Sequence, residues 1–366
     1  NVVVGVLGCM AQRLGLGLID EKPIVNFVVG PDGYRHIPEI LKNIQNNGEF
    51  NNLPVINEQE TYSDIYPTRV KGISAWVAVM RGCNNFCSYC IVPFVRGRER
   101  SRSVKNVISE VEKLVTEGYS EVTLLGQNVN SYHDGNNDFA DLLKYVSQVD
   151  GIKRVRFATS HPKDLSQKLL KTIGENERIC SHIHLAVQSG SDNILKLMNR
   201  KYTREHFLSL IEMSRELIEE PGIYTDVIVG FPGETESDFN DTLNLIEEVQ
   251  FDGAFTFKYS PRSGTAAARL KETVSEEEKQ NRLSQLIQLQ KKITLKRNRQ
   301  LIKTTQQVLV EGPDKKGHPN QLMGRTGANK IVVFESNRNS RAGKLVDVKI
   351  KNAEGQTLFG ELIHSI

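Results

Sequence analysis

The chain has 366 residues, 39% of them hydrophobic and 25% charged, and a formal net charge of +3. This composition is typical of globular proteins, and the length is sufficient for two or three domains. No apolar run approaches the ~20 residues of a membrane span and no signal peptide is visible, so we expect a cytoplasmic protein without membrane contact. Because the first residue is Asn1 rather than methionine, we also expect that the start of the natural chain is missing.

Residues 1–70 are predicted to be part of an α/β domain followed by a linker. The apolar run Val2–Leu7 is typical of a buried parallel strand, and a helix is expected to begin after Gly8. A second strand, Phe27–Val29, ends in a turn sequence. Parallel sheets bind ligands at the carboxyl ends of their strands, which is where Cys9 lies, although a lone cysteine there is more often a packing residue. The polar residues 50–72 are predicted to be the linker.

Residues 71–301 are predicted to alternate between strands and helices. Repeated β–α units imply a parallel sheet with right-handed crossovers. Six strands would form a partial barrel, with the site at the carboxyl ends of the strands as in (β/α)8 barrels. The expected strands are 75–79, 121–125, 154–158, 182–187, 224–229 and 254–259, and the expected helices are 105–117, 138–149, 164–172, 203–219, 235–249 and 275–301.

The last part of the chain changes in character. The helix over 275–301 begins with acidic residues and ends with basic ones, which suits its dipole. Short β-rich runs at 305–311, 330–334, 344–350 and 357–363 then alternate with turn residues, which predicts a small β-barrel. Residues 301–366 hold 10 Lys+Arg and 6 Asp+Glu, a net +4. A basic barrel beside a basic helix end predicts an RNA-binding surface.

Three of the five cysteines form a C-x3-C-x2-C motif directly after the first strand of the central region. Cys83, Cys87 and Cys90 are spaced to hold three irons of a [4Fe–4S] cluster, and because such clusters usually have four cysteine ligands, the fourth iron would be open to a small molecule. The alternative is a zinc site completed by a distant histidine. The aromatic residues Phe86 and Tyr89 within the motif favour the cluster, which needs shielding from water.

The motif is similar to the signature of the radical S-adenosylmethionine (SAM) superfamily. Its continuation, residues 91–102, resembles that of the methylthiotransferases, and the C-terminal region resembles a TRAM domain at 324–326 and 330–334. The resemblance covers essentially the whole chain. It implies an incomplete N-terminal methylthiotransferase domain with a linker over 1–70, a partial (β/α)6 radical SAM barrel over 71–301, and a TRAM β-barrel over 302–366.

The resemblance also implies cofactors and partners. One [4Fe–4S] cluster would be bound by the catalytic triplet, and SAM by polar residues after the strands: Gln127, Asn128, Ser160, Gln188, Ser189 and Asp226. An auxiliary [4Fe–4S] cluster would include Cys9, but its other two cysteines lie upstream in relatives and are absent here. A flavodoxin- or ferredoxin-type electron donor and a sulfur or iron–sulfur carrier would be the protein partners.

Basic side chains are expected to contact the RNA, because guanidinium groups suit phosphate: Arg96, Arg98, Arg100, Arg102, Arg325 and Lys330. The resemblance implies transfer of a methylthio group to C2 of N6-isopentenyladenosine beside the anticodon of tRNA. Two alternatives stay open: a sister enzyme acting on threonylcarbamoyl-adenosine in tRNA or on a ribosomal-protein aspartate, and a zinc-stabilised RNA-binding protein without catalysis.

Overall fold

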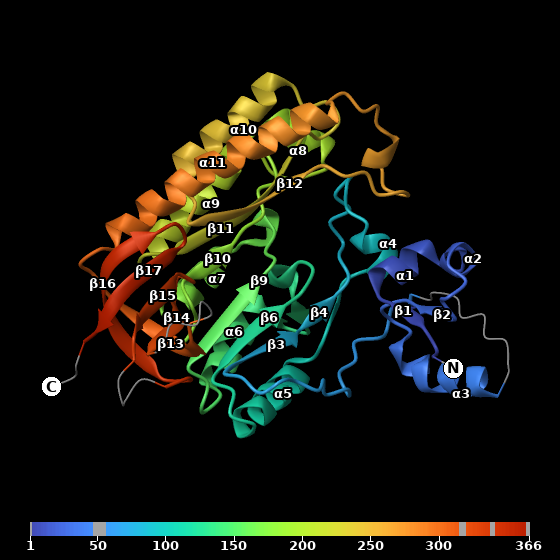
Figure 1. Cartoon of the computed structure of the whole chain (residues 1–366), viewed down its shortest axis with the longest axis horizontal. Coiled ribbons are helices and arrows are strands. Elements are labelled where there is room, and N and C mark those ends of the chain that lie inside the picture. Colours follow the sequence, from blue (N-terminus) through green and yellow to red (C-terminus); the bar gives the residue numbers. More distant parts are fainter. Residues whose placement is uncertain (1, 47–55, 315–319, 337–340, 364–366) are drawn as a thin grey trace.

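The computed structural model describes residues 2–46, 56–314, 320–336 and 341–363 (Figure 1). The N-terminal unit contains the parallel strands β1 (Gly5–Leu7) and β2 (Phe27–Val29) and the helices α1 (Cys9–Leu14), α2 (Gly17–Glu21) and α3 (Ile37–Gln45). The first strand is shorter than predicted, and α2 and α3 were not predicted. The described part of the expected linker, 56–72, has neither helix nor strand, and 50–55 lie outside the described residues.

The central region contains the six predicted parallel strands, in two sheets. One sheet has the order β3 (Ser74–Ala78), β6 (Glu121–Leu125) and β9 (Arg154–Ala158); the other has β10 (His182–His184), β11 (Gly222–Val229) and β12 (Gly253–Lys258). Isolated β-bridges connect the segment around β9 to the residues just before and just after β10. Ser160 N also donates a hydrogen bond to His184 O. In the described part of the chain no ladder joins β3 to β12, so the barrel is partial, as predicted.

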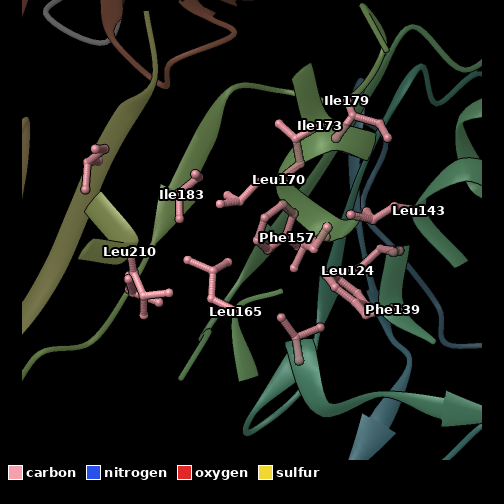
Figure 2. Close-up of a cluster of buried hydrophobic side chains, with 14 of the residues drawn as sticks. Leu124, Phe139, Leu143, Phe157, Leu165, Leu170, Ile173, Ile179, Ile183 and Leu210 are labelled. Atoms are coloured by element: carbon pink, nitrogen blue, oxygen red, sulfur yellow. The ribbon is translucent and has the colours of Figure 1, made fainter. Parts of the chain in front are cut away.

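Helices cover the outer face of these sheets, and most begin where a capping residue predicts. The side chains of Ser103, Asp138, Ser166, Thr203, Thr235 and Ser275 each accept a backbone hydrogen bond at the start of α5 (Val104–Thr116), α6 (Phe139–Gln148), α7 (Gln167–Gly174), α9 (Arg204–Leu217), α10 (Glu236–Val249) and α11 (Glu276–Gln300). Alternate strand residues such as Leu124 and Phe157 pack against the helices in the main core (Figure 2). None of the described helices is both long and apolar enough to cross a membrane.

Several short elements were not predicted, because each is too short to show a hydrophobic period. They are α4 (Val92–Arg96), α8 (Asp192–Leu197), β4 (Met80–Arg81), β5 (Arg100–Ser101), β7 (His133–Asp134) and β8 (Asn137–Asp138). Two of them shape the candidate site, since β4 and β5 pair at the base of the cysteine loop and α8 anchors its tip.

The C-terminal strands close into a barrel with the order β13-β14-β15-β17-β16. Their bounds are Thr305–Pro313, Gln321–Thr326, Ile331–Glu335, Leu345–Glu354 and Thr357–Leu362 for β13 to β17. Four of these strands were predicted. The prediction missed β14, because a glycine and polar residues interrupt the alternation of apolar and polar side chains that marks a strand.

The closed barrel is attached to the amino ends of the central strands, the end opposite the cysteine loop (Figure 1). Arg154 and Arg156 of β9 donate hydrogen bonds to its backbone carbonyls, including Arg156 Nη2 to Thr326 O at 2.8 Å and Arg154 Nη2 to Gln307 O at 2.9 Å. On the other sheet, the buried Asp252 carboxylate pairs with Lys330 Nζ at 2.6 Å and with Arg297 Nη2 at 3.1 Å. These charged groups lie inside the junction and fix the position of the barrel.

The N-terminal unit is held against the central region by a buried carboxylate. Asp32, 6% exposed, lies after β2, and its two oxygens accept hydrogen bonds from Arg100 Nη2 at 2.9 and 2.8 Å. Arg81 Nη2 donates to the same carboxylate at 2.9 Å. A single carboxylate therefore pairs with two arginines that flank the cysteine motif.

We predict that Asp32→Ala releases the N-terminal unit, because removing one partner of a buried ion pair leaves uncompensated charge and costs about 3–5 kcal/mol. Hydrogen exchange of the amides in α1 and α3 measures the free energy of this local opening. Asp64→Ala is the matched control, since its carboxylate pairs with Arg35 but is 69% exposed, and it should leave the exchange rates unchanged. Equal exchange in the two variants would contradict the prediction.

Candidate active site at the carboxyl ends of the strands

The cysteine loop is closed at its base by a glycine that no other residue can replace without strain. Gly82 has φ = 75°, and a Cβ atom there would lie 1.9 Å from the carbonyl oxygen of Arg98. Both features exclude an ordinary side chain. Cys83 N then donates to Gly97 O at 3.2 Å, so the start and the end of the loop are held side by side.

The tip of the loop is anchored to the end of α8. Ser88 donates from its backbone N to Met198 O at 2.9 Å and from Oγ to Leu197 O at 2.7 Å. The amide of Asn199 donates to Phe86 O at 2.9 Å. The loop is therefore fixed by hydrogen bonds to a segment more than a hundred residues later in the chain, which makes its conformation part of the folded barrel.

The three thiols of the motif lie in a water-poor environment. Cys83 and Cys87 are 8% and 9% exposed, and Cys90 is half-buried. Burial raises the pKa of the Cys83 thiol to about 11 and also raises the pKa of Cys90, so binding of a metal must displace protons. Within the described ranges, no three His, Cys, Asp or Glu side chains are grouped to hold one metal ion.

One arginine contacts the motif and was missed by the sequence analysis. Arg200, 8% exposed, lies just after α8, and its Nη1 donates to Cys87 Sγ at 3.4 Å. Its Nε donates to the hydroxyl of Tyr202 at 2.8 Å, and its Nη2 to Ala186 O. A guanidinium group beside a thiolate stabilises negative charge there. A single arginine without a recognisable motif gave no sequence signal for this role.

Four of the side chains predicted to bind a cofactor carry buried oxygen atoms that lack a hydrogen-bond partner among the described residues. They are Gln127 Oε1, Asn128 Oδ1, Ser160 Oγ and Gln188 Oε1, which follow or flank the carboxyl ends of successive strands. Unpaired buried polar atoms are rare in folded proteins and require an explanation. Gln188 also has φ = 70°, a strained conformation of the kind found at ligand sites. These residues therefore fit a polar small molecule bound beside the cysteine loop.

The two other predicted cofactor residues already have partners within the chain. Ser189 is fully buried, and its Oγ lies 3.3 Å from Thr242 Oγ1 and accepts from Ser191 N at 3.2 Å. This serine helps to shape the turn before α8. Asp226 Oδ1 lies 3.0 Å from His184 Nε2 on the inner face of the sheet. Its side chain is 22% exposed, so it is partly accessible to a ligand.

Cys9 lies at the start of α1, and the structure brings it against the end of the cysteine-loop segment. Arg96 of α4 donates from Nε to Cys9 Sγ at 3.2 Å, and α1 packs on α4 (Figure 1). The N-terminal unit thus presents this cysteine to the same end of the partial barrel as the C-x3-C-x2-C motif. Its partner Arg96 supplies a positive charge beside the thiol.

The six basic residues predicted to contact RNA divide into two groups. Arg100 pairs with Asp32, Arg102 with Glu110 at 2.6 Å, and Lys330 with Asp252, and all three are buried. An arginine or lysine is rarely buried without a counterion, and each of these three has its counterion within the chain. We therefore do not include them in an RNA-binding surface. Arg98 stacks on the Phe86 ring at 4.4 Å and is exposed. Arg96, which donates to Cys9, and Arg325, which pairs with Glu311 at 2.9 Å, are both partly exposed.

Two family models match the chain: the radical SAM superfamily over residues 77–246 and the TRAM domain over residues 299–363. Among solved structures, a radical S-adenosylmethionine methyltransferase, TsrM from Kitasatospora setae with cobalamin and a [4Fe-4S] cluster bound, has a TM-score of 0.59 at 15% identity. The match covers 73% of this chain and 58% of that one. At this identity the likeness concerns the fold alone.

Similarity to named relatives extends over nearly the whole chain. A tRNA-2-methylthio-N(6)-dimethylallyladenosine synthase of Moorella thermoacetica is 46% identical over 371 residues, which cover 99% of this chain and 82% of the relative. Synthases with the same name from Clostridium novyi and Bacteroides fragilis are 44% and 46% identical, and the matches cover 99% and 100% of this chain and 81% of each relative. The chain is therefore a member of the radical SAM superfamily and, within it, of the family of tRNA-2-methylthio-N(6)-dimethylallyladenosine synthases.

Proposed function

We propose that this chain adds a methylthio group to C2 of N6-isopentenyladenosine next to the anticodon of tRNA. The observation that carries the proposal is the cluster of buried, unpaired oxygens beside a buried cysteine triplet, in a chain 46% identical to synthases named for this product. Three domains would share the work: residues 1–70 with the linker, the radical SAM domain over 71–301, and the TRAM domain over 302–366.

Cys83, Cys87 and Cys90 would hold the [4Fe–4S] cluster of the superfamily, and Gln127, Asn128, Ser160, Gln188 and Asp226 would contact SAM. When bound, these cofactors supply a 5′-deoxyadenosyl radical. The protein contributes the positioning: the loop fixed by Gly82 sets the direction of the three thiols. The buried oxygens would be acceptors for donor groups of SAM, and Arg200 balances charge at Cys87.

We propose that Cys9 is a ligand of a second, auxiliary cluster that carries the sulfur to be transferred. Support comes from its place beside Arg96, directly against the helix that follows the cysteine motif. The proposal requires a flavodoxin- or ferredoxin-type electron donor and a sulfur or iron–sulfur carrier as partners, and a cytoplasmic location, where these and tRNA are available. In the substrate tRNA, phosphates would contact Arg96, Arg98 and Arg325.

A nucleoside profile of tRNA tests the proposed substrate. In a strain that lacks the gene for this protein, mass spectrometry is expected to show complete loss of 2-methylthio-N6-isopentenyladenosine and accumulation of N6-isopentenyladenosine. Re-expression of the protein should restore the product. If the methylthio form of threonylcarbamoyl-adenosine, or a modified ribosomal-protein aspartate, disappears instead, the sister activity is the correct one.

A further inference from the structure

A cavity lies at the junction between the central barrel and the C-terminal barrel, away from the cysteine loop. Its volume is about 240 Å³, and its walls come from β11, β12, α11 and the closed barrel. Sites for drug-sized ligands usually measure about 300–1,000 Å³, so this cavity is suited to a smaller group. It lies outside the proposed cofactor site, and of the proposed RNA contacts only Arg325 lines it.

The chemistry of the walls is that of a nucleobase site. Tyr224 and Phe255 contribute aromatic side chains, and Phe255 is 60% exposed although it is large and apolar. Asn298 of α11 is fully buried; its Nδ2 donates to Gly355 O at 2.9 Å, but its Oδ1 has no partner among the described residues. Asn329 and Gln356 add further amide groups. Aromatic faces with amide groups at the edge are how proteins bind unstacked RNA bases.

Two further features connect the cavity to RNA and to the reaction site. The end of α11 beside it presents exposed basic residues, Lys291, Lys292 and Arg299, which can follow a phosphate backbone. Phe255 contacts the ring of His184 at 5.8 Å between centroids, and His184 in turn lies 3.0 Å from Asp226. Asp226 is one of the proposed cofactor contacts, so contacts through His184 link one wall residue of the cavity to the proposed reaction site.

We propose that this cavity binds an unpaired base of the anticodon loop, a neighbour of the nucleoside that is modified. Phe255 stacks on the base, and the buried Asn298 Oδ1 accepts a hydrogen bond from an amino or ring N–H group of that base. An inorganic phosphate suits the cavity less well, because the charged groups of its walls already have partners: Lys330 pairs with Asp252 at 2.6 Å and Arg325 with Glu311 at 2.9 Å. The inference rests on the proposed function, since it assumes that tRNA is the substrate.

The test is a set of binding measurements with anticodon stem-loop RNA that carries N6-isopentenyladenosine. Fluorescence anisotropy gives the Kd of the loaded enzyme for the intact RNA and for RNAs with an abasic site at each loop position in turn. We expect one position at which loss of the base weakens binding about tenfold, as for other bases stacked on aromatic side chains. In Phe255→Ala, binding of the intact RNA weakens by the same factor, and the abasic site at that position has no further effect.

Tyr145→Ala is the matched control, because Tyr145 is 42% exposed on α6, on the outer helical layer. It should bind every RNA as the unchanged protein does. If Phe255→Ala does not fold, Gln356→Ala, an exposed change at the opposite wall, replaces it with the same expected pattern. The proposal is overturned if Phe255→Ala binds like the control, or if its abasic penalties all equal those of the unchanged protein. By contrast, failure of the unchanged protein to bind or modify the RNA refutes the proposed function instead.

Discussion

Replacement of Cys87 by alanine is expected to abolish the formation of 5′-deoxyadenosine from SAM. The thiol is 9% exposed and lies in a loop fixed at both ends, so no other side chain can move in to replace it. Because the proposed cluster loses one of its three ligands, it is no longer held by the protein. The iron and sulfide content should therefore fall together with the activity. Anaerobic purification, iron analysis and chromatography of the SAM products measure both effects.

Cys180→Ala is the control for this experiment. Cys180 is also buried, at 4% exposure, but it lies just before β10 at the amino ends of the strands. This variant should keep its iron and continue to cleave SAM. Continued formation of 5′-deoxyadenosine by Cys87→Ala would show that the central site is misassigned. Zinc in place of iron in the unchanged protein would refute the proposed cofactor.

The second large effect is expected for Cys9→Ala, which should remove the methylthio product but not the cleavage of SAM. Cys9→Ala leaves Cys83, Cys87 and Cys90 in place, so SAM cleavage should continue. In protein produced from the natural gene, the methylthio product should be lost, because the proposed sulfur-carrying cluster no longer has this ligand. The ratio of methylthio-nucleoside to 5′-deoxyadenosine, measured by mass spectrometry in one reaction, is therefore expected to fall to zero.

A conservative change at its neighbour provides the comparison. Arg96→Lys keeps a positive charge beside Cys9 but loses the planar group that donates to Sγ, and it should retain part of the product ratio. Equal loss of SAM cleavage and product in Cys9→Ala would show that the cysteine acts on the whole fold. An unchanged product ratio would show that Cys9 has no part in sulfur transfer.

The architecture of the central region could be predicted because its signals are local and repeated. Apolar and polar residues alternate in strands such as Glu121–Leu125, and residues such as Ser275 cap the helices, so each β–α unit can be predicted separately. Because a helix connects each strand to the next, the strands are then expected to pair in parallel. Some of the shortest elements, such as β4 and α8, were missed. β4 forms by pairing with β5, a segment later in the chain, and α8 is too short to show a helical period although Ser191 caps it.

The part of the candidate site that could be predicted is the part formed by one sequence motif. The spacing of the three cysteines is visible in the sequence, whereas the role of each arginine depends on which carboxylate the fold places next to it. Arg100 and Arg102 follow the motif and suggested an anionic substrate, but Asp32 and Glu110 neutralise them. Arg200 shows the reverse case: a residue without a motif that tertiary structure brings to Cys87.

The attachment of the C-terminal barrel through Arg154, Arg156 and Asp252 has a consequence for how a target is selected. The anchored end and the reactive end of the sheet are separated by the length of a strand, and the six residues of β12 span about 20 Å. Because charged groups lock the junction, this distance is constant from one turnover to the next. Any RNA that contacted both the closed barrel and the reactive end would therefore have to bridge a fixed spacing.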